Sequence, residues 1–285
     1  ALEFHGSVNF MKAALLHADR ITTVSPTYAE EIKNPYYGER LDGLLRKRSE
    51  VLTGILNGIN YEVYDPSKDS FLDMPLDNLS HMKKENKKHL QTILELPILG
   101  EKAVLGMVTQ LADQKGIDLL VHVMEDILVQ EVQMVIVGTG EIRYKEMLCY
   151  FASKYPEKLA IRLEFSNKLA HELYAGADIF LMPSRFEPCG TAQMIAMRYG
   201  TIPVVRETGG LKDTVMPYNE MTGAGNGFSF ANYNAHEFLY AVQRALSLYQ
   251  SDKQVWYDLG KKAFESDFSW ERSANAYLEL YELLL

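Results

Sequence analysis

The run DIFLMPSRFEPCG occupies residues 178–190, and its composition changes from apolar to polar and proline-containing after residue 182. Residues 178–182 are mostly apolar, which is typical of a short buried strand, and a proline-containing turn follows them. Pro188 and Gly190 stand at the entrance of a helix predicted for residues 190–199, where they let the backbone approach a ligand closely. A strand that leads through a turn into a helix is the repeating unit of a parallel α/β sheet.

The same unit recurs from about residue 102 onward. Continuous apolar runs predict strands at 103–108, 132–137, 159–163, 178–182 and 202–205. Amphipathic periodicity predicts helices near 116–128, 141–154, 167–175, 190–199, 233–249, 253–265 and 271–284. This alternation predicts an α/β fold, a Rossmann-like parallel sheet with helices on both faces, whose ligands bind at the carboxyl ends of the strands.

The N-terminal third is less regular. A helical pattern covers 10–18, and short strand-like runs cover 21–24 and 51–56. Residues 64–100 resemble a connector, and we expect its mixed charge run at 83–88 to be a solvated helix face.

Composition restricts the classes of function. The 285 residues are 47% hydrophobic, as in a globular protein, and the net charge of −9 argues against a nucleic-acid or membrane partner. No apolar run approaches the roughly 20 residues of a membrane helix. Two cysteines imply no disulfide framework, which fits a reducing cytoplasm. No His or Cys spacing is typical of a metal site. His171 follows a predicted strand and could line the cleft, but we favour the interpretation that it is a satisfied surface histidine.

Three loops at predicted strand ends carry candidate chemistry. Lys115 precedes a helix start, where it could pair with a phosphate or be a solvated surface lysine. Glu187 could accept hydrogen bonds from sugar hydroxyls or complement a helix dipole. Thr208, Gly209 and Gly210 precede another helix and could cradle a phosphate, although most glycine pairs are plain turns.

These loops, in this order, resemble the glycogen and starch synthases of glycosyltransferase family 5, which have the two-domain GT-B fold. The resemblance covers essentially the whole chain and rests on residues 18–19, 23–32, 56–60, 114–118, 183–190, 193–194, 198–201 and 208–215.

The resemblance assigns roles to single residues. It implies that Lys115 neutralises the phosphates of the leaving nucleotide and that Glu187 contacts the donor glucose. It places Phe165 against the base. The remaining implied donor-binding residues are Cys189, Gly190, Thr191, Thr208, Gly209, Gly210 and Leu211. The implied reaction is a metal-independent transfer of glucose, with retention, from ADP-glucose or UDP-glucose to the non-reducing end of an α-1,4-glucan.

The chain also departs from the family. Gln110 stands where the family has an arginine that assists Lys115, and this removes a charge and a bidentate fork from the phosphate site. After Cys-Gly the chain has Thr191-Ala192 instead of Leu-Thr or Leu-Ser, so a hydroxyl has moved by one position. A related glycosyltransferase family with other donors has a second glutamate where this chain has Ile195, and that difference favours the synthases.

The resemblance further implies the domain organisation. Residues 1–57 would be the end of an N-terminal domain that is mostly missing, 58–270 the nucleotide-sugar-binding domain, and 271–285 a helix that returns toward the first domain with an exposed apolar face. The family's N-terminal lysine–glycine–glycine–leucine loop is absent, so we expect this hexosyltransferase chain to be inactive alone. The alternative is a non-catalytic paralogue that binds a nucleotide or glucan. The compartment implied is the cytoplasm, or the plastid stroma for a plant protein.

Overall fold

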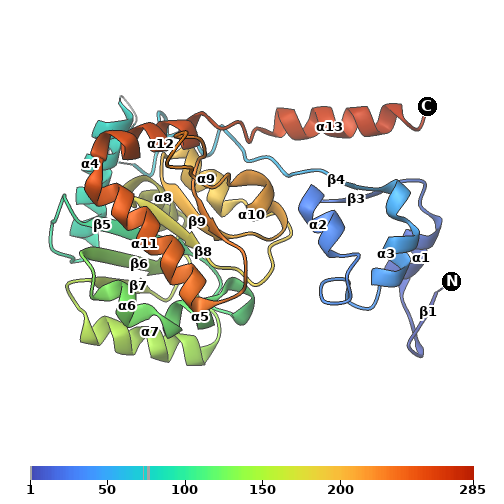
Figure 1. Ribbon diagram of the computed structural model, residues 1–285, viewed down its shortest axis with the longest axis horizontal. Helices are drawn as coiled ribbons and strands as arrows, with labels where there is room; N and C mark the ends of the chain where they lie inside the picture. Colours follow the sequence, from blue (N-terminus) through green and yellow to red (C-terminus); the bar gives the residue numbers. More distant parts are fainter. Residues whose placement is uncertain (1, 73, 76–77) are drawn as a thin grey trace.

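A six-stranded parallel sheet is the centre of the computed structural model, which describes residues 2–72, 74–75 and 78–285 (Figure 1). The strands are β5 (Ala103–Val108), β6 (Val132–Val137), β7 (Leu159–Arg162), β8 (Ile179–Met182), β9 (Ile202–Arg206) and β10 (Phe228–Phe230). Their order across the sheet is β10-β9-β8-β5-β6-β7, and every neighbouring pair is parallel. The predicted Rossmann-like fold is therefore confirmed. The strand β10 was missed because three residues are too short to show a pattern.

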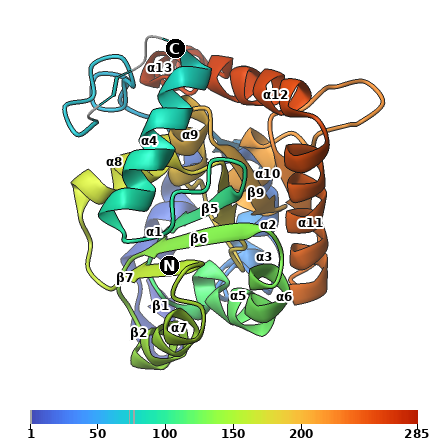
Figure 2. The same ribbon diagram turned by 90° about the vertical axis from the view of Figure 1, so that its left-hand side faces the viewer.

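Helices cover both faces of this sheet (Figure 2). The helices α8 and α9 pack on one face, with α4 lying on α8 and α12 on α9, while α6 and α11 pack on the other face. Their bounds are α4 (Leu79–Ile93), α5 (Ile117–His122), α6 (Met124–Leu128), α7 (Ile142–Lys154), α8 (Asn167–Gly176), α9 (Ala192–Arg198), α10 (Gly209–Thr214), α11 (Ala235–Ser251), α12 (Lys253–Glu265) and α13 (Trp270–Glu282). The helix expected at 116–128 is divided at Val123.

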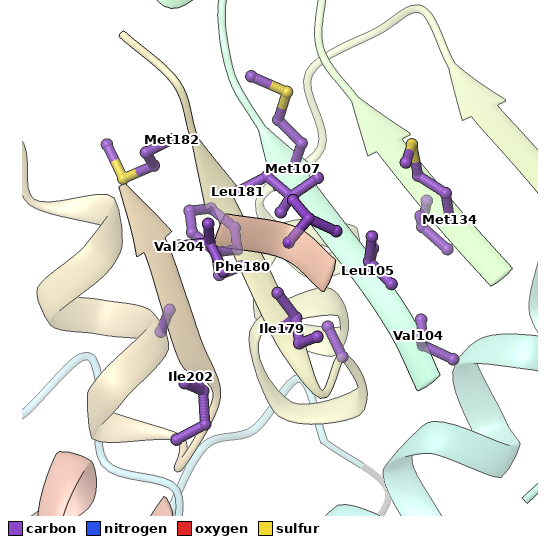
Figure 3. Close-up of a cluster of buried hydrophobic side chains, with 14 of the residues drawn as sticks. Val104, Leu105, Met107, Met134, Ile179, Phe180, Leu181, Met182, Ile202 and Val204 are labelled. Carbon is purple, nitrogen blue, oxygen red and sulfur yellow. The ribbon is translucent and has the colours of Figure 1, made fainter. Parts of the chain in front are cut away.

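The strands are buried on both faces, which explains why they read as continuous apolar runs rather than as alternating patterns. Leu105, Phe180 and Val204 come from three adjacent strands and belong to one cluster of buried side chains (Figure 3). The packing of this cluster fixes where each strand ends, and so it positions the loops at the carboxyl edge of the sheet.

The charge run at 83–88 does form a helix, but the expectation that it is a solvated face is only partly right, since Lys84 and Lys88 are exposed while Lys83 and Lys87 reach into the sheet domain. Lys87 is buried, and its ammonium group lies 2.8 Å from the carboxylate of Asp178. Lys83 donates to the carbonyl of Ala177, just beyond the end of α8, and to the hydroxyl of Thr201. Both lysines therefore satisfy buried acceptors of the sheet domain, because a long side chain can carry its charge far from its own helix.

The N-terminal part is a smaller layer beside the sheet domain (Figure 1). It contains β1 (Glu3–Phe4), β2 (Ser7–Val8), α1 (Phe10–His17), β3 (Ile21–Thr23), α2 (Pro26–Glu31), α3 (Asp42–Lys47), the 3₁₀ turn η1 (Ser49–Val51) and β4 (Leu52–Gly54). The helix α13 extends back over this part, and Leu278 and Tyr281 on it are more than half exposed. Among the described residues, every helix is too short or too polar to cross a membrane.

Candidate functional site

The order of the strands reverses at β5: β6 and β7 are added on one side of it, and β8, β9 and β10 on the other. The strands β5 and β8 are neighbours, although the chain passes through β6 and β7 between them. At such a reversal the loops that follow the two strands diverge and leave a crevice, which is the usual ligand site of an open α/β sheet. A cavity of about 390 Å³ lies there and is lined by Gln110, Lys115, Glu187, Cys189, Gly190 and Thr191. The structure thus gathers six of the predicted site residues around one space.

Lys115 and Glu187 form an ion pair across this cavity. The Lys115 ammonium group donates to Glu187 Oε2 at 2.7 Å, and the hydroxyl of Ser184 lies 3.3 Å from the same oxygen. Glu187 is only 7% exposed. The interpretation of Lys115 as a solvated surface lysine is therefore wrong, since its ammonium group forms an ion pair with a buried carboxylate.

The backbone holds the two loops close together. Gly116 has a φ of +73°, and a Cβ atom there would lie 2.0 Å from the Pro183 carbonyl oxygen, so only glycine fits without distortion. The Arg185 N–H donates to the Gln114 carbonyl at 2.8 Å. Beneath them, the buried Arg206 donates through Nε to the Ser184 carbonyl at 2.8 Å. No role was predicted for Arg206, although a charged residue directly after the apolar run at 202–205 is a usable signal.

A second cavity of about 570 Å³ adjoins the first along Val108, Thr109 and Gln110. It is bordered by the turn Gly138–Gly140 and by Phe165, which is 65% exposed. An exposed aromatic ring beside a cavity offers a face on which a planar group can stack. Together the two cavities form an extended space that is charged at one end and aromatic at the other.

Thr208, Gly209, Gly210 and Leu211 lie behind the Glu187 turn and do not line either cavity. The Thr208 hydroxyl and the Gly209 N–H donate to the carboxylate of Glu31, and the Gly210 N–H donates to the carbonyls of Glu187 and Pro188. Leu211 is fully buried in the core. A direct contact between these residues and a diphosphate stays a prediction.

Cys189 lies in the floor of the first cavity and is 5% exposed. Burial raises the pKa of its thiol, although a hydrogen bond from the backbone of Asn57 acts in the opposite direction. Asn57 also lines the cavity, so the segment after β4 contributes to the site. This contribution could not be predicted from the sequence, because the position of Asn57 depends on how the N-terminal part packs on the sheet domain.

His171 also differs from the prediction, since it is buried rather than at the surface. Its Nδ1 lies 2.7 Å from Asp69 Oδ2, which also accepts a hydrogen bond from the Tyr199 hydroxyl, and Tyr64 stacks on its ring. Burial alone would raise the pKa of Asp69, but the hydrogen bonds from His171 and Tyr199 outweigh it and hold the pKa below its ordinary value. This cluster fixes the connector to the sheet domain, away from the cavities.

In the described ranges no group of His, Cys, Asp and Glu side chains is arranged to hold a metal.

Comparison with known sequences gives two family matches. Residues 92–262 match the family described as "Glycosyl transferases group 1", and residues 1–47 match the "Starch synthase catalytic domain". A glycogen synthase from Anoxybacillus flavithermus is 52% identical over 285 residues, and one from Desulfitobacterium hafniense is 51% identical over 283. These alignments cover 100% and 99% of this chain but only 59% and 58% of the relatives, so the chain spans about three-fifths of their length.

Solved structures give the same grouping. The catalytic domain of starch synthase IV from Arabidopsis thaliana, bound to ADP and acarbose, superposes with a TM-score of 0.90 at 36% identity, covering 96% of this chain and 57% of that one. The Anabaena protein HepE in complex with UDP and glucose has a TM-score of 0.66 at 17% identity, covering 94% of this chain and 64% of that one. The second likeness shows the fold alone.

Proposed function

Since the chain belongs to the group 1 glycosyltransferases, and among them to the glycogen (starch) synthases, we propose that it forms the donor-nucleotide half of a synthase active site. The reaction is the retaining transfer of glucose from a nucleotide donor to the non-reducing end of an α-1,4-glucan. The observation that carries the proposal is the pairing of Lys115 with Glu187 in the cavity at the point where the strand order reverses.

The ion pair suggests how the donor is held. A diphosphate in the first cavity competes with Glu187 for the Lys115 ammonium group and brings negative charge to the only lysine that lines this cavity within the described ranges. Glu187, released from the lysine, can then accept hydrogen bonds from glucose hydroxyls. When the glycosidic bond to the phosphate breaks, Lys115 stabilises the charge that develops on the leaving group. These steps use fixed protein charges and require no metal.

The donor we propose is ADP-glucose. The starch synthase IV structure is described as bound to ADP, and the second cavity with Phe165 offers a stacking face for an adenine ring. We place the glucan acceptor on the side of the first cavity that faces away from Phe165. Part of the acceptor site would come from the residues that the full-length relatives have and this chain does not cover. We therefore expect this chain to bind the donor nucleotide but not to turn it over.

Gln110 sets the strength of this site. It is exposed at the junction of the two cavities, where an arginine would add a second cation beside Lys115. The replacement Gln110→Arg should increase ADP affinity by roughly tenfold or more, since hydrogen bonds to charged groups contribute about 1.5–3 kcal/mol.

The test is calorimetric titration of this chain with ADP, UDP and ADP-glucose in the presence of a chelator. Dissociation constants between about 1 μM and 1 mM that favour ADP would support the proposal. The matched variant Lys115→Gln should weaken binding of all three compounds, whereas Lys145→Gln on the distant helix α7 should not. Binding that Lys115→Gln leaves unchanged would refute the site.

A further inference from the structure

The helices α2 and α10 cap each other at their N-termini. The carboxylate of Glu31, at the end of α2, accepts hydrogen bonds from the Thr208 hydroxyl at 2.9 Å and from the Gly209 N–H at 3.1 Å. The carboxylate of Asp213, near the end of α10, accepts from the Thr27 N–H at 3.1 Å, from the Thr27 hydroxyl at 2.5 Å and from the Ser25 hydroxyl. Each negative charge thus lies at the end of the partner helix that favours it.

The same turn of α10 supports the donor site. Gly210 donates its N–H to the carbonyls of Glu187 and Pro188, each at 3.2 Å. A Cβ atom on Gly210 would lie 2.1 Å from the Cys189 carbonyl oxygen, so no side chain separates α10 from the Glu187–Gly190 turn. Glu31 therefore contacts one side of this helical turn, and the backbone of the donor site contacts the other side.

The contact also joins two parts of the chain that match different families. Glu31 lies within residues 1–47, which match the starch synthase catalytic domain, and α10 lies within residues 92–262, which match the group 1 glycosyltransferases. We propose that Glu31, together with Asp213, is a positioning residue that holds α10 against the Glu187–Gly190 turn. The packing of the N-terminal part on the sheet domain then sets where the Glu187 carboxylate lies.

The charge of Glu31 is essential to this role. Its two oxygens accept from a hydroxyl and an N–H that have no other acceptor among the described residues, and hydrogen bonds to a charged group are about twice as strong as neutral ones. Glu31→Gln removes the negative charge and leaves one oxygen to accept from both the Thr208 hydroxyl and the Gly209 N–H, while the new NH₂ group can only donate. The first turn of α10 should then move away from α2, and the Glu187 turn should move with it.

The part of the inference that concerns the donor rests on the proposed function, so two measurements are needed. Hydrogen exchange at the Gly210 amide reports the contact between α10 and the Glu187 turn without any ligand. In Glu31→Gln we expect this amide to exchange at least about tenfold faster than in the unaltered chain. Asp213→Asn should accelerate the same amide. The control Glu30→Gln should not, because the Glu30 carboxylate is 74% exposed and its ion pair is with Lys33, just beyond the end of α2.

Calorimetric titration with ADP and with ADP-glucose tests the effect on the site. Because Glu187 is proposed to contact the glucose while Lys115 holds the phosphates, Glu31→Gln should weaken ADP-glucose about tenfold and ADP by less than about threefold. An equal loss for both compounds, or unchanged exchange at Gly210, would overturn the positioning role. If the unaltered chain binds neither compound, the proposed function fails, and the exchange measurement alone decides whether Glu31 holds α10.

Discussion

Replacing Gly210 by alanine should disturb the donor site through backbone contacts alone. The added Cβ atom would lie 2.1 Å from the carbonyl oxygen and 2.5 Å from the Cα atom of Cys189. Ordinary contacts of a Cβ atom lie at 3.4–4 Å, so the turn and α10 must separate by about 1 Å. Gly210 has no left-handed φ, so the effect is steric and does not come from backbone strain.

The expected magnitude follows from these contacts. Overpacking in a tight core costs about 1–3 kcal/mol, and alanine recovers roughly 0.5–1 kcal/mol through its higher helix propensity. A net loss of about 1 kcal/mol should lower the midpoint of thermal unfolding by roughly 2–4 °C. We also expect ADP-glucose affinity to fall by about tenfold, since the loss of one hydrogen bond between the Glu187 carboxylate and the donor would cost about 1.5 kcal/mol or more.

Differential scanning calorimetry and donor titration on the same preparations check both expectations. The matched control is Gly43→Ala in α3, where the nearest atom to the added Cβ is the flexible end of Arg46 at 3.7 Å. That variant should keep its donor affinity and unfold at the same temperature or slightly above it. A Gly210→Ala chain that unfolds within about 1 °C of the unaltered protein and binds ADP-glucose normally would show that the steric reasoning is wrong.

Three further predictions concern titratable groups. Burial lowers the pKa of Lys83 to about 7, far below its ordinary value, so between about pH 7 and 10 the unfolded chain holds a proton that the folded chain has lost. Urea unfolding should therefore show stability rising with pH relative to Lys83→Met, by up to about 1.4 kcal/mol per pH unit, and a flat difference would contradict this. The pKa of Asp69 is lowered, so its contribution is present at neutral pH, and the stability difference from Asp69→Asn should shrink as the pH falls below about 4. In alkylation followed by mass spectrometry, the exposed Cys149 should react well before Cys189, whose thiol is buried and has a raised pKa, and equal rates would argue against the buried position.

The sequence by itself determined the sheet and the loops that carry the chemistry. Strands buried on both faces must be apolar throughout, so the runs at 103–108 and 132–137 matched β5 and β6 to the residue. Lys115 and Glu187 lie in the loops that follow β5 and β8, and parallel topology brings the ends of such strands to one edge. Their meeting in one cavity was therefore predictable from local pattern and chain order.

Only the tertiary structure decided which partner each polar group finds. Glu31 lies 177 residues from Thr208 in sequence, and no periodicity relates the two positions. The same holds for the pairs Lys87–Asp178 and His171–Asp69. Lys87 and His171 were expected in solvent, and both are buried. The physical reason is that hydrophobic pattern reports whether a backbone segment is buried, whereas a long polar side chain is placed by whichever acceptor the packed elements bring within reach.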